Sequence, residues 1–425
     1  MTEATGSSGG GIPLRTFFDD KISHRLGGRS FGKGTGTYKF AVVKEAKARA
    51  RLLHPDMQLI DMGVGEPDLP ADKRIVEVLC REAGKKENRF YADNGIAEFQ
   101  EAAAGYLKKV YGVEIDDPSG SIIHGIGSKP VLAMLPLAFI NPGDITLAIV
   151  PGYPIISTWT KYLGGEVYDL PLREANDFYP DFTGIPAGVL KRAKLLYINY
   201  PNNPTGQTAT VEFYRQAVDF ACRNNIVVVS DAAYAPLAYD GCKPLSFLSV
   251  DGAMEVGVEI HSLSKAFNMT GWRIAFVTGN ARAISAYGTV KDNTDSGQFR
   301  AIQKAGVYAL KHPEITDPIC EKYSRRFNLM VKALNEVGFN AVKPKSTFYC
   351  YVKSPVGAGN GLRFNSAEEA AAFLIEKALI SVIPWDDAGA YLRFSVTFEA
   401  GSEEEEIKII NKMKERLSGL KLVFE

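Results

Sequence analysis

Residues 258–273 read VEIHSLSKAFNMTGWR, an apolar run followed by two serines, a lysine and, eight residues further on, an arginine. The run predicts a buried strand over Val258–Ser262, so that Lys265 stands just past the strand's carboxyl end. Parallel α/β sheets bind their ligands outside that end. A lysine there can react with an aldehyde, whereas hydroxyls and an arginine suit a phosphate; a solvated lysine at a helix start is the alternative interpretation. The groups concerned are Ser262, Ser264, Lys265 and Arg273.

Strand-length apolar runs recur along the middle of the chain and alternate with helical segments. They are nearly continuous in apolar residues, which is expected of strands whose two faces are both covered by helices. Val211–Arg223 has the spacing of one such covering helix. The alternation predicts an α/β domain with a mostly parallel sheet between helices. The further predicted strands are 145–150, 195–199, 226–230 and 274–278.

Polar residues follow two of these predicted strands. Asp231 ends the stretch NNIVVVSD, and Tyr234 follows three residues later. A carboxylate that emerges from a run of valines is costly to bury without a cationic partner, and a protonated pyridine nitrogen is such a partner. NYPNNPTG, residues 199–206, contains Asn203, whose amide would face the same ligand; an ordinary turn is the alternative interpretation.

The segment GIGSKP, residues 125–130, precedes the apolar helical run VLAMLPLAF. Pro130 is well placed in the first turn of a helix, where a missing N–H is tolerated. The free backbone amides at that end of a helix form a site for an anion. A simple strand-to-helix turn is the alternative interpretation.

The composition restricts the possible function classes. The chain has 425 residues with 49 Lys and Arg against 49 Asp and Glu, so no net charge favours nucleic acid or an acidic membrane surface. The five cysteines are scattered and no CxxC or HExxH motif occurs, which argues against a disulfide framework and a bound metal. The N-terminus lacks the apolar region of a secretory signal, and no apolar run reaches the length of a bilayer span. We therefore expect a cytoplasmic protein without a metal ion.

The C-terminal part has a different pattern from the middle. Thr347–Val352 and Tyr391–Phe398 alternate like half-buried strands, and Ser366 and Ser402 each precede a glutamate by three residues, the spacing of a capping box. This predicts a smaller α+β domain. The expected division is a mobile tail over 1–12, an N-terminal arm and part of the small domain over 13–58, a large domain over 59–314 and a small domain over 315–425.

Arg393 lies in the predicted strand YLRFSVTF, residues 391–398. Because side chains alternate along a strand, Arg393 points away from the apolar face. There it would form a bidentate pair with a substrate carboxylate; a solvated sheet arginine is the alternative interpretation. The apolar face consists of Leu392, Phe394, Val396 and Phe398.

Taken together, these motifs resemble the fold-type I, pyridoxal phosphate (PLP)-dependent aminotransferases of class I and II. The likeness extends from about Ile60 to the end of the chain. Within that family, the chain is similar to the branch of the LL-diaminopimelate aminotransferases through PGYP, YINYPNNPTG, HSLSKAFNMTGWR, VKDNTDSGQF and PWDDAGAYLRFSVTF. The residues that stand in the family's order and approximate spacing are Asn203, Asp231, Tyr234, Ser262, Ser264, Lys265 and Arg273.

The resemblance implies PLP as the cofactor. Lys265 would hold it covalently and would also move a proton as general base and acid. Asp231 would keep the ring nitrogen protonated, Tyr234 and Asn203 would bond the ring oxygen, and Tyr153 would stack on the ring. The phosphate would lie among Gly127, Ser128, Lys129, Ser262, Ser264 and Arg273.

The resemblance also implies substrate contacts and a homodimer with shared active sites. Arg393 would bind the substrate α-carboxylate, with the backbone of Gly65 beside it. Tyr91 of one subunit would reach the phosphate held by the neighbouring subunit. The full substrate-binding set would be Gly65, Lys129, Asn203, Asn293 and Arg393.

The activity implied is transamination between LL-2,6-diaminopimelate and 2-oxoglutarate, which gives tetrahydrodipicolinate and glutamate in lysine and cell-wall precursor synthesis. A preference for LL- over meso-diaminopimelate is expected from the resemblance alone. An aspartate or aromatic aminotransferase and a PLP lyase of the same fold remain alternatives. A PLP-binding regulatory domain fused to a DNA-reading module is disfavoured by the lack of a basic patch.

Overall fold

The computed structural model describes residues 18, 21–31 and 39–425. The chain divides into two compact units, Met1–Glu45 and Ala46–Glu425. In the first unit, two 3₁₀ turns, His24–Leu26 and Gly28–Ser30, meet at Gly27, whose φ of 104° requires the freedom of glycine. The mobile tail predicted over 1–12 lies outside the described residues.

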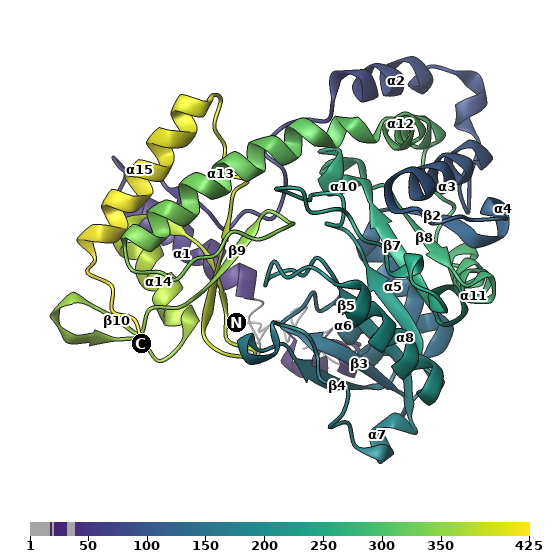
Figure 1. Cartoon of the computed structure of the whole chain (residues 1–425), viewed down its shortest axis with the longest axis horizontal. Coiled ribbons are helices and arrows are strands. Elements are labelled where there is room, and N and C mark those ends of the chain that lie inside the picture. The colour runs from purple at the N-terminus through teal and green to yellow at the C-terminus, as the bar shows by residue number, and fades with distance from the viewer. Residues whose placement is uncertain (1–17, 19–20, 32–38) are drawn as a thin grey trace, which may run out of the picture. The chain divides into compact units, whose positions relative to one another are not determined.

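The central element of the second unit is a seven-stranded sheet in the order β2-β8-β7-β6-β5-β3-β4. Five neighbouring strands, from β7 to β4, run parallel, and β8 is antiparallel to both β7 and β2. The predicted α/β fold with a mostly parallel sheet is therefore confirmed (Figure 1). The strands are β2 Ile122–Gly125, β3 Ile145–Val150, β4 Glu166–Pro171, β5 Ala193–Asn199, β6 Val227–Asp231, β7 Gly257–Ser262 and β8 Ala275–Gly279.

The two edge strands, β2 and β4, were not among the predicted strands. β4 reads EVYDLP, and only one of its residues is buried, so it lacks the continuous apolar run of its neighbours. β2 has only four residues, although all of them are buried. A short strand and a half-exposed edge strand carry a weaker apolar signal than the central strands.

Burial of the central strands explains their sequence. Every residue of β7 and β8 is buried, as expected for strands with helices on both faces. Helices α5, α8 and α11 pack against β7, β6 and β8 respectively. The helices of this part are α2 Lys73–Ala83, α3 Ala97–Tyr111, α4 Pro118–Ser121, α5 Ser128–Phe139, α6 Ile155–Tyr162, α7 Ala187–Leu190, α8 Val211–Asn224, α9 Ala253–Val256, α10 Leu263–Ala266, α11 Ala281–Asp292 and α12 Arg300–Lys311.

Helix α8 illustrates how sequence sets these helices. Its N-cap, Thr210, accepts a hydrogen bond from Phe213 N at 3.1 Å, and Asn225 ends it in the left-handed conformation. Between these caps, one face buries apolar side chains such as Tyr214 and Val218. Full burial of an apolar side chain contributes about 1.5–3 kcal/mol, so this face ties the helix to the sheet.

A second, smaller sheet lies in the C-terminal part of the chain, in the antiparallel order β13-β14-β9. The long helix α13 runs beside it and packs on α15 (Figure 1). A two-stranded parallel sheet pairs β1 with β12, and β10 pairs with β11. The remaining strands and longer helices of the chain are β1 Ile60–Asp61, β9 Tyr349–Lys353, β10 Gly357–Ala358, β11 Leu362–Arg363, β12 Ile380–Ser381, β13 Ile383–Trp385, β14 Tyr391–Ser395, α1 Lys39–Leu53, α13 Asp317–Glu336, α14 Ala367–Ala378 and α15 Glu403–Gly419.

The two predicted capping boxes are present. Ser366 Oγ accepts from Glu369 N at 3.2 Å, and Ser402 Oγ accepts from Glu405 N at 3.3 Å. Each glutamate reaches back to the backbone amide just before its serine, so the first turns of α14 and α15 are closed reciprocally.

Two apolar cores underlie the second unit. One surrounds the large sheet and draws on residues between Ala71 and Ile315. The other draws on α13, α14, α15 and β14 and also on Ile60, Met62 and residues 233–239. The division into domains at 59–314 and 315–425 stays a prediction.

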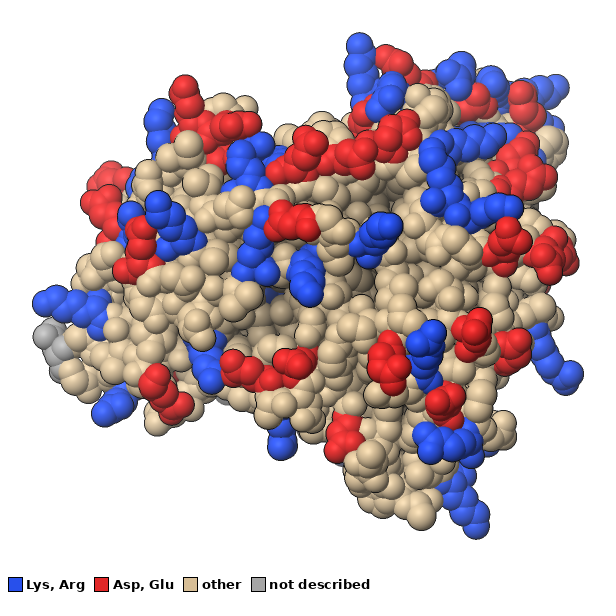
Figure 2. Space-filling model, viewed as in Figure 1, with Lys and Arg blue, Asp and Glu red and all other residues tan. Residues whose placement is uncertain are grey.

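Within the described part of the chain, no helix is both long and apolar enough to span a bilayer. Acidic and basic side chains are interspersed over the face shown in Figure 2.

Candidate active site

The polar residues predicted from strand ends lie at one edge of the large sheet. β5, β6 and β7 are parallel neighbours and end at Asn199, Asp231 and Ser262. Lys265 follows in the short helix α10, whose N-cap Ser262 accepts from Ser264 N at 3.2 Å. Because the carboxyl ends of parallel strands meet at one edge, the sheet brings these side chains together.

Lys265 is held against the chain segment that follows β1. Its Nζ donates to the Gly65 carbonyl at 2.9 Å. Burial lowers the pKa of Lys265 to about 8, although Glu66 opposes the shift; the positive charges of Arg273 and Arg393 add to it. A lysine with this pKa has a larger share of neutral, nucleophilic amine near physiological pH than an ordinary lysine.

Asp231 is 4% exposed at the end of β6. Burial raises its pKa to about 6, against hydrogen bonds from Ala233 N at 3.3 Å and Tyr197 Oη at 3.2 Å. Both donors are uncharged, so the carboxylate is stabilised only weakly in its ionised form. A cation placed against this carboxylate would restore its charge, and a protonated ring nitrogen fits that requirement.

The segment predicted to bind an anion, residues 125–130, leads into α5 at Gly127. This glycine is the N-cap of α5, with a φ of 82°, and a Cβ added to it would lie 2.1 Å from Arg273 Nη2. Arg273 donates from Nη1 to Thr270 O at 2.7 Å and approaches Ser264 Oγ at 3.5 Å. A guanidinium, a hydroxyl and the free first-turn amides of α5 form a donor set for a phosphate.

Arg393 in β14 is not solvated, since it is only 2% exposed. Its Nη1 donates to Asn203 Oδ1 at 2.8 Å and its Nη2 to Gly63 O at 3.1 Å, while its guanidinium carbon lies 4.0 Å from the centre of the Tyr349 ring. Its Nε is buried and has no hydrogen-bond partner among the described residues. A planar donor held in this way suits a carboxylate ligand.

Tyr234 joins the two halves of the site. Its Oη lies 3.2 Å from Tyr349 Oη, and burial raises the pKa of the Tyr234 phenol. A Cβ added to Gly65 would lie 3.0 Å from the same Tyr349 Oη and 3.8 Å from Arg393 Nη2. The site therefore combines strand ends of the large sheet with β9, β14 and the segment after β1.

Sequence reasoning missed Gly63, Tyr197 and Tyr349 as members of this site. The alternation over Thr347–Val352 predicted a strand but gave no sign that Tyr349 faces Tyr234, 115 residues away in the chain. Gly63 acts through its carbonyl, and a backbone acceptor leaves no mark in a side-chain pattern.

Three of the remaining predicted site residues lie at exposed positions, and a fourth, Tyr153, is partly buried. Lys129 is exposed, and Tyr153 packs partly buried against the first core. Tyr91 is 78% exposed, and Asn293 is exposed with its Nδ2 donating to Thr289 O. The segments of these last two lie together, because Asn94 Nδ2 donates to Asp292 Oδ1 at 2.8 Å.

The donor set fits PLP. Asp231 suits the ring nitrogen, the donors around Gly127 and Arg273 suit the phosphate, and Lys265 suits the aldehyde. The close approach at Gly127 is the most specific of these observations, because any side chain there would overlap the Arg273 guanidinium.

Residues 57–412 match the family model of aminotransferase class I and II. The chain is 57% identical over 420 residues to an LL-diaminopimelate aminotransferase of Methanocaldococcus jannaschii, covering 97% of this chain and 100% of that protein. It is 53% identical over 417 residues to one of Methanococcus maripaludis, covering 97% and 100%. Among solved structures, substrate-bound BacF of Bacillus subtilis has a TM-score of 0.83 at 33% identity, covering 92% of this chain and 97% of that one.

Proposed function

The chain belongs to the class I and II aminotransferases, and from this premise we propose that it transfers an amino group between LL-2,6-diaminopimelate and 2-oxoglutarate. The products are tetrahydrodipicolinate and glutamate. The observation that carries the proposal is the convergence of Lys265 and Arg393 on the carbonyls of Gly65 and Gly63. This places a nucleophilic amine near a buried donor for a carboxylate, which are the two groups that transamination of an amino acid needs.

The proposed cofactor is PLP, which when bound supplies an electron sink for the bonds at the substrate α-carbon. Asp231 keeps the ring nitrogen protonated, Tyr234 and Asn203 bond the ring oxygen, and Tyr153 covers the ring. The phosphate is bound by Gly127, Ser128, Lys129, Ser262, Ser264 and Arg273.

The remaining steps fall to the side chains. Arg393 binds the α-carboxylate and so orients the Cα–H bond of the amino acid. Lys265, as a neutral amine, takes the α-proton and later returns a proton to complete the transfer. The burial of Arg393 and the partial burial of Lys265 limit the access of water to this exchange.

We further propose a homodimer in the cytoplasm in which Tyr91 and Asn293 serve the partner's site. The support is their position: both side chains are exposed, neither contacts Lys265 or Arg393 in the described structure, and their segments lie together. In such a dimer, Tyr91 reaches the phosphate and Asn293 the substrate.

The test of the substrate is half-transamination of the PLP enzyme, followed at the cofactor's absorbance. We expect LL-diaminopimelate to react faster than meso-diaminopimelate, aspartate or phenylalanine. A site that pairs the distal ammonium and carboxylate rejects analogues without them, because its own polar groups are then left unpaired. If aspartate or phenylalanine reacts faster, the substrate assignment is wrong, although the aminotransferase activity stands.

Arg393→Lys is expected to weaken the binding of both LL-diaminopimelate and 2-oxoglutarate. The substitution keeps the charge but loses the planar fork that binds a carboxylate through two donors. A hydrogen bond to a charged group contributes about 1.5–3 kcal/mol, so the KM of each substrate should rise roughly 10- to 100-fold.

The matched control is Arg192→Lys. Arg192 makes a two-donor pair with Glu166 at 2.8 Å for each contact, but this pair lies on the exposed edge strand β4. Its KM values should equal those of the wild type. Unchanged KM values in Arg393→Lys would exclude Arg393 as the carboxylate-binding residue.

A further inference from the structure

Residues 62–68, hereafter the 62–68 segment, carry two acceptors of the active site. Gly65 O accepts from Lys265 Nζ at 2.9 Å, and Gly63 O accepts from Arg393 Nη2 at 3.1 Å. The segment has no regular secondary structure, because β1 ends at Asp61 and α2 begins at Lys73. Its position, and with it the orientation of both cations, depends on its neighbours.

The first half of the segment is bound to the C-terminal chain. Ser395 N donates to Met62 O at 2.7 Å, and Thr397 Oγ1 donates to Val64 O at 3.1 Å. Thr397 also lies 2.8 Å from Ser395 through their hydroxyls. These donors follow Arg393 directly in the chain, so their hydrogen bonds couple the position of the segment to that of Arg393.

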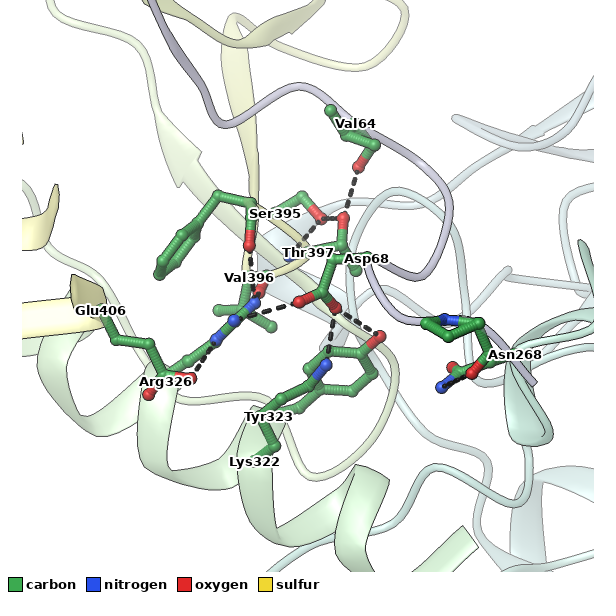
Figure 3. Close-up of polar contacts among 12 residues, drawn as sticks. Val64, Asp68, Asn268, Lys322, Tyr323, Arg326, Ser395, Val396, Thr397 and Glu406 are labelled. Carbon is green, nitrogen blue, oxygen red and sulfur yellow. Dashed lines mark hydrogen bonds and ion pairs between the residues drawn. The ribbon is translucent and has the colours of Figure 1, made fainter. Parts of the chain in front are cut away.

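The second half ends in a buried carboxylate, as Figure 3 shows. The Asp68 side chain is 1% exposed and pairs with Lys322 Nζ at 2.6 Å and Arg326 Nη2 at 3.0 Å. Both cations come from α13. The segment is thus fastened at this end to a helix of the C-terminal part.

Arg326 connects this carboxylate to the rest of the C-terminal part (Figure 3). Its side chain is fully buried, and its Nε donates to Glu406 Oε1 at 2.8 Å. Its Nη1 donates to both Val396 O and Phe398 O at 2.8 Å, on either side of Thr397. One guanidinium therefore joins α13, α15, the chain after β14 and the 62–68 segment.

Stability alone does not account for this network. Taking charges out of water costs several kcal/mol per ion, and apolar replacements of buried ion pairs are often as stable. The charged pairs fix Asp68 at one end of the 62–68 segment. Through Arg326 they also fix the backbone on either side of Thr397, which donates to Val64 in the first half of the segment. We propose that Asp68 and Arg326 are positioning residues, which hold Gly63 and Gly65 where they orient Arg393 and Lys265 for the reaction. This rests on the roles of those two residues in the proposed function.

The test is Asp68→Asn in the enzyme loaded with pyridoxamine phosphate, reacted with 2-oxoglutarate in single turnovers, whose concentration dependence gives the dissociation constant. The substitution keeps the shape of the side chain but removes the charge that holds Lys322 and Arg326. A displacement of about 1 Å at a reacting group costs on the order of 100-fold in rate, so we expect kcat/KM with both substrates to fall roughly 10- to 100-fold and the dissociation constant to rise with it. Amide hydrogen exchange in the 62–68 segment should be faster than in the wild type.

Arg325→Ala is the matched control. Arg325 pairs with the same Glu406 at 3.0 Å and is 37% exposed, but its ion pairs are with Glu403 and Glu406 and not with the 62–68 segment. Its dissociation constant for 2-oxoglutarate and its hydrogen exchange should be those of the wild type.

A second variant tests the proposal if Asp68→Asn does not fold. The triple substitution Asp68→Leu, Lys322→Met and Arg326→Met removes the carboxylate together with both of its cations, leaves Glu406 with Arg325, and should fold with the same loss of affinity. A folded variant of either kind with wild-type affinity overturns the proposal, and so does failure of both to fold, since the network would then serve the fold as a whole. Failure of the wild-type pyridoxamine form to bind and convert 2-oxoglutarate would instead refute the proposed function.

Discussion

Lys265→Ala should fold and keep some PLP but lose turnover by on the order of 10⁴-fold or more. The substitution removes both the covalent anchor and the group that moves the α-proton, and a general acid–base alone contributes roughly 10²- to 10⁴-fold. Steady-state rates with LL-diaminopimelate and 2-oxoglutarate measure the loss, and cofactor absorbance measures the PLP that remains.

Borohydride reduction with peptide mapping checks the same residue in the wild type. The reduced label should be found on Lys265, whose burial lowers its pKa to about 8. Lys243→Ala provides the control, because this lysine is exposed and should keep full turnover. Label on Lys129 or Lys243 would refute the assignment.

Asp231→Asn should bind PLP yet slow proton abstraction severely. An amide is nearly isosteric with the carboxylate but cannot hold the ring nitrogen protonated, so the electron sink is weakened. We expect single-turnover rates with LL-diaminopimelate to fall by roughly 10²-fold or more, a loss comparable to that of a general acid–base group. Near-normal rates would show that Asp231 is not the partner of the ring nitrogen. The control is Asp219→Asn, at an exposed position of α8.

The apoprotein offers a second measurement on Asp231. Burial raises its pKa to about 6 from an ordinary 3.8, so the folded state binds more protons than the unfolded state between these values. The stability that Asp231 contributes is therefore present below about pH 4 and is lost as the pH rises through 6; about two pKa units correspond to about 3 kcal/mol. The melting temperature of apo Asp231→Asn should accordingly rise relative to wild type between pH 4 and 7, and PLP should stabilise the wild type more than the variant.

The large sheet could be predicted because its central strands are nearly continuous runs of apolar residues. Runs such as 226–230, IVVVS, are almost entirely apolar, since each strand lies between helices, and the predicted bounds agree with β6 to within one residue. The strand predicted over Tyr391–Phe398 ends earlier, at Ser395. After it, Val396 O accepts a hydrogen bond from the Arg326 side chain and Val396 N donates to Phe348 O. β2 and β4 escaped prediction because a short strand and a half-exposed edge strand leave only a weak apolar pattern.

The sequence by itself determined which residues stand at strand ends, because a strand's length and direction are local properties of the chain. The positions of Lys265 and Asp231 after β7 and at the end of β6 follow from that alone, and so does the position of Gly127 before α5. Only the tertiary structure decided that Arg393 is buried and donates to Gly63, 330 residues away, and that Asp68 meets Arg326. Such contacts depend on how two cores pack against each other, and that packing is set by the whole chain rather than by any periodicity within a segment.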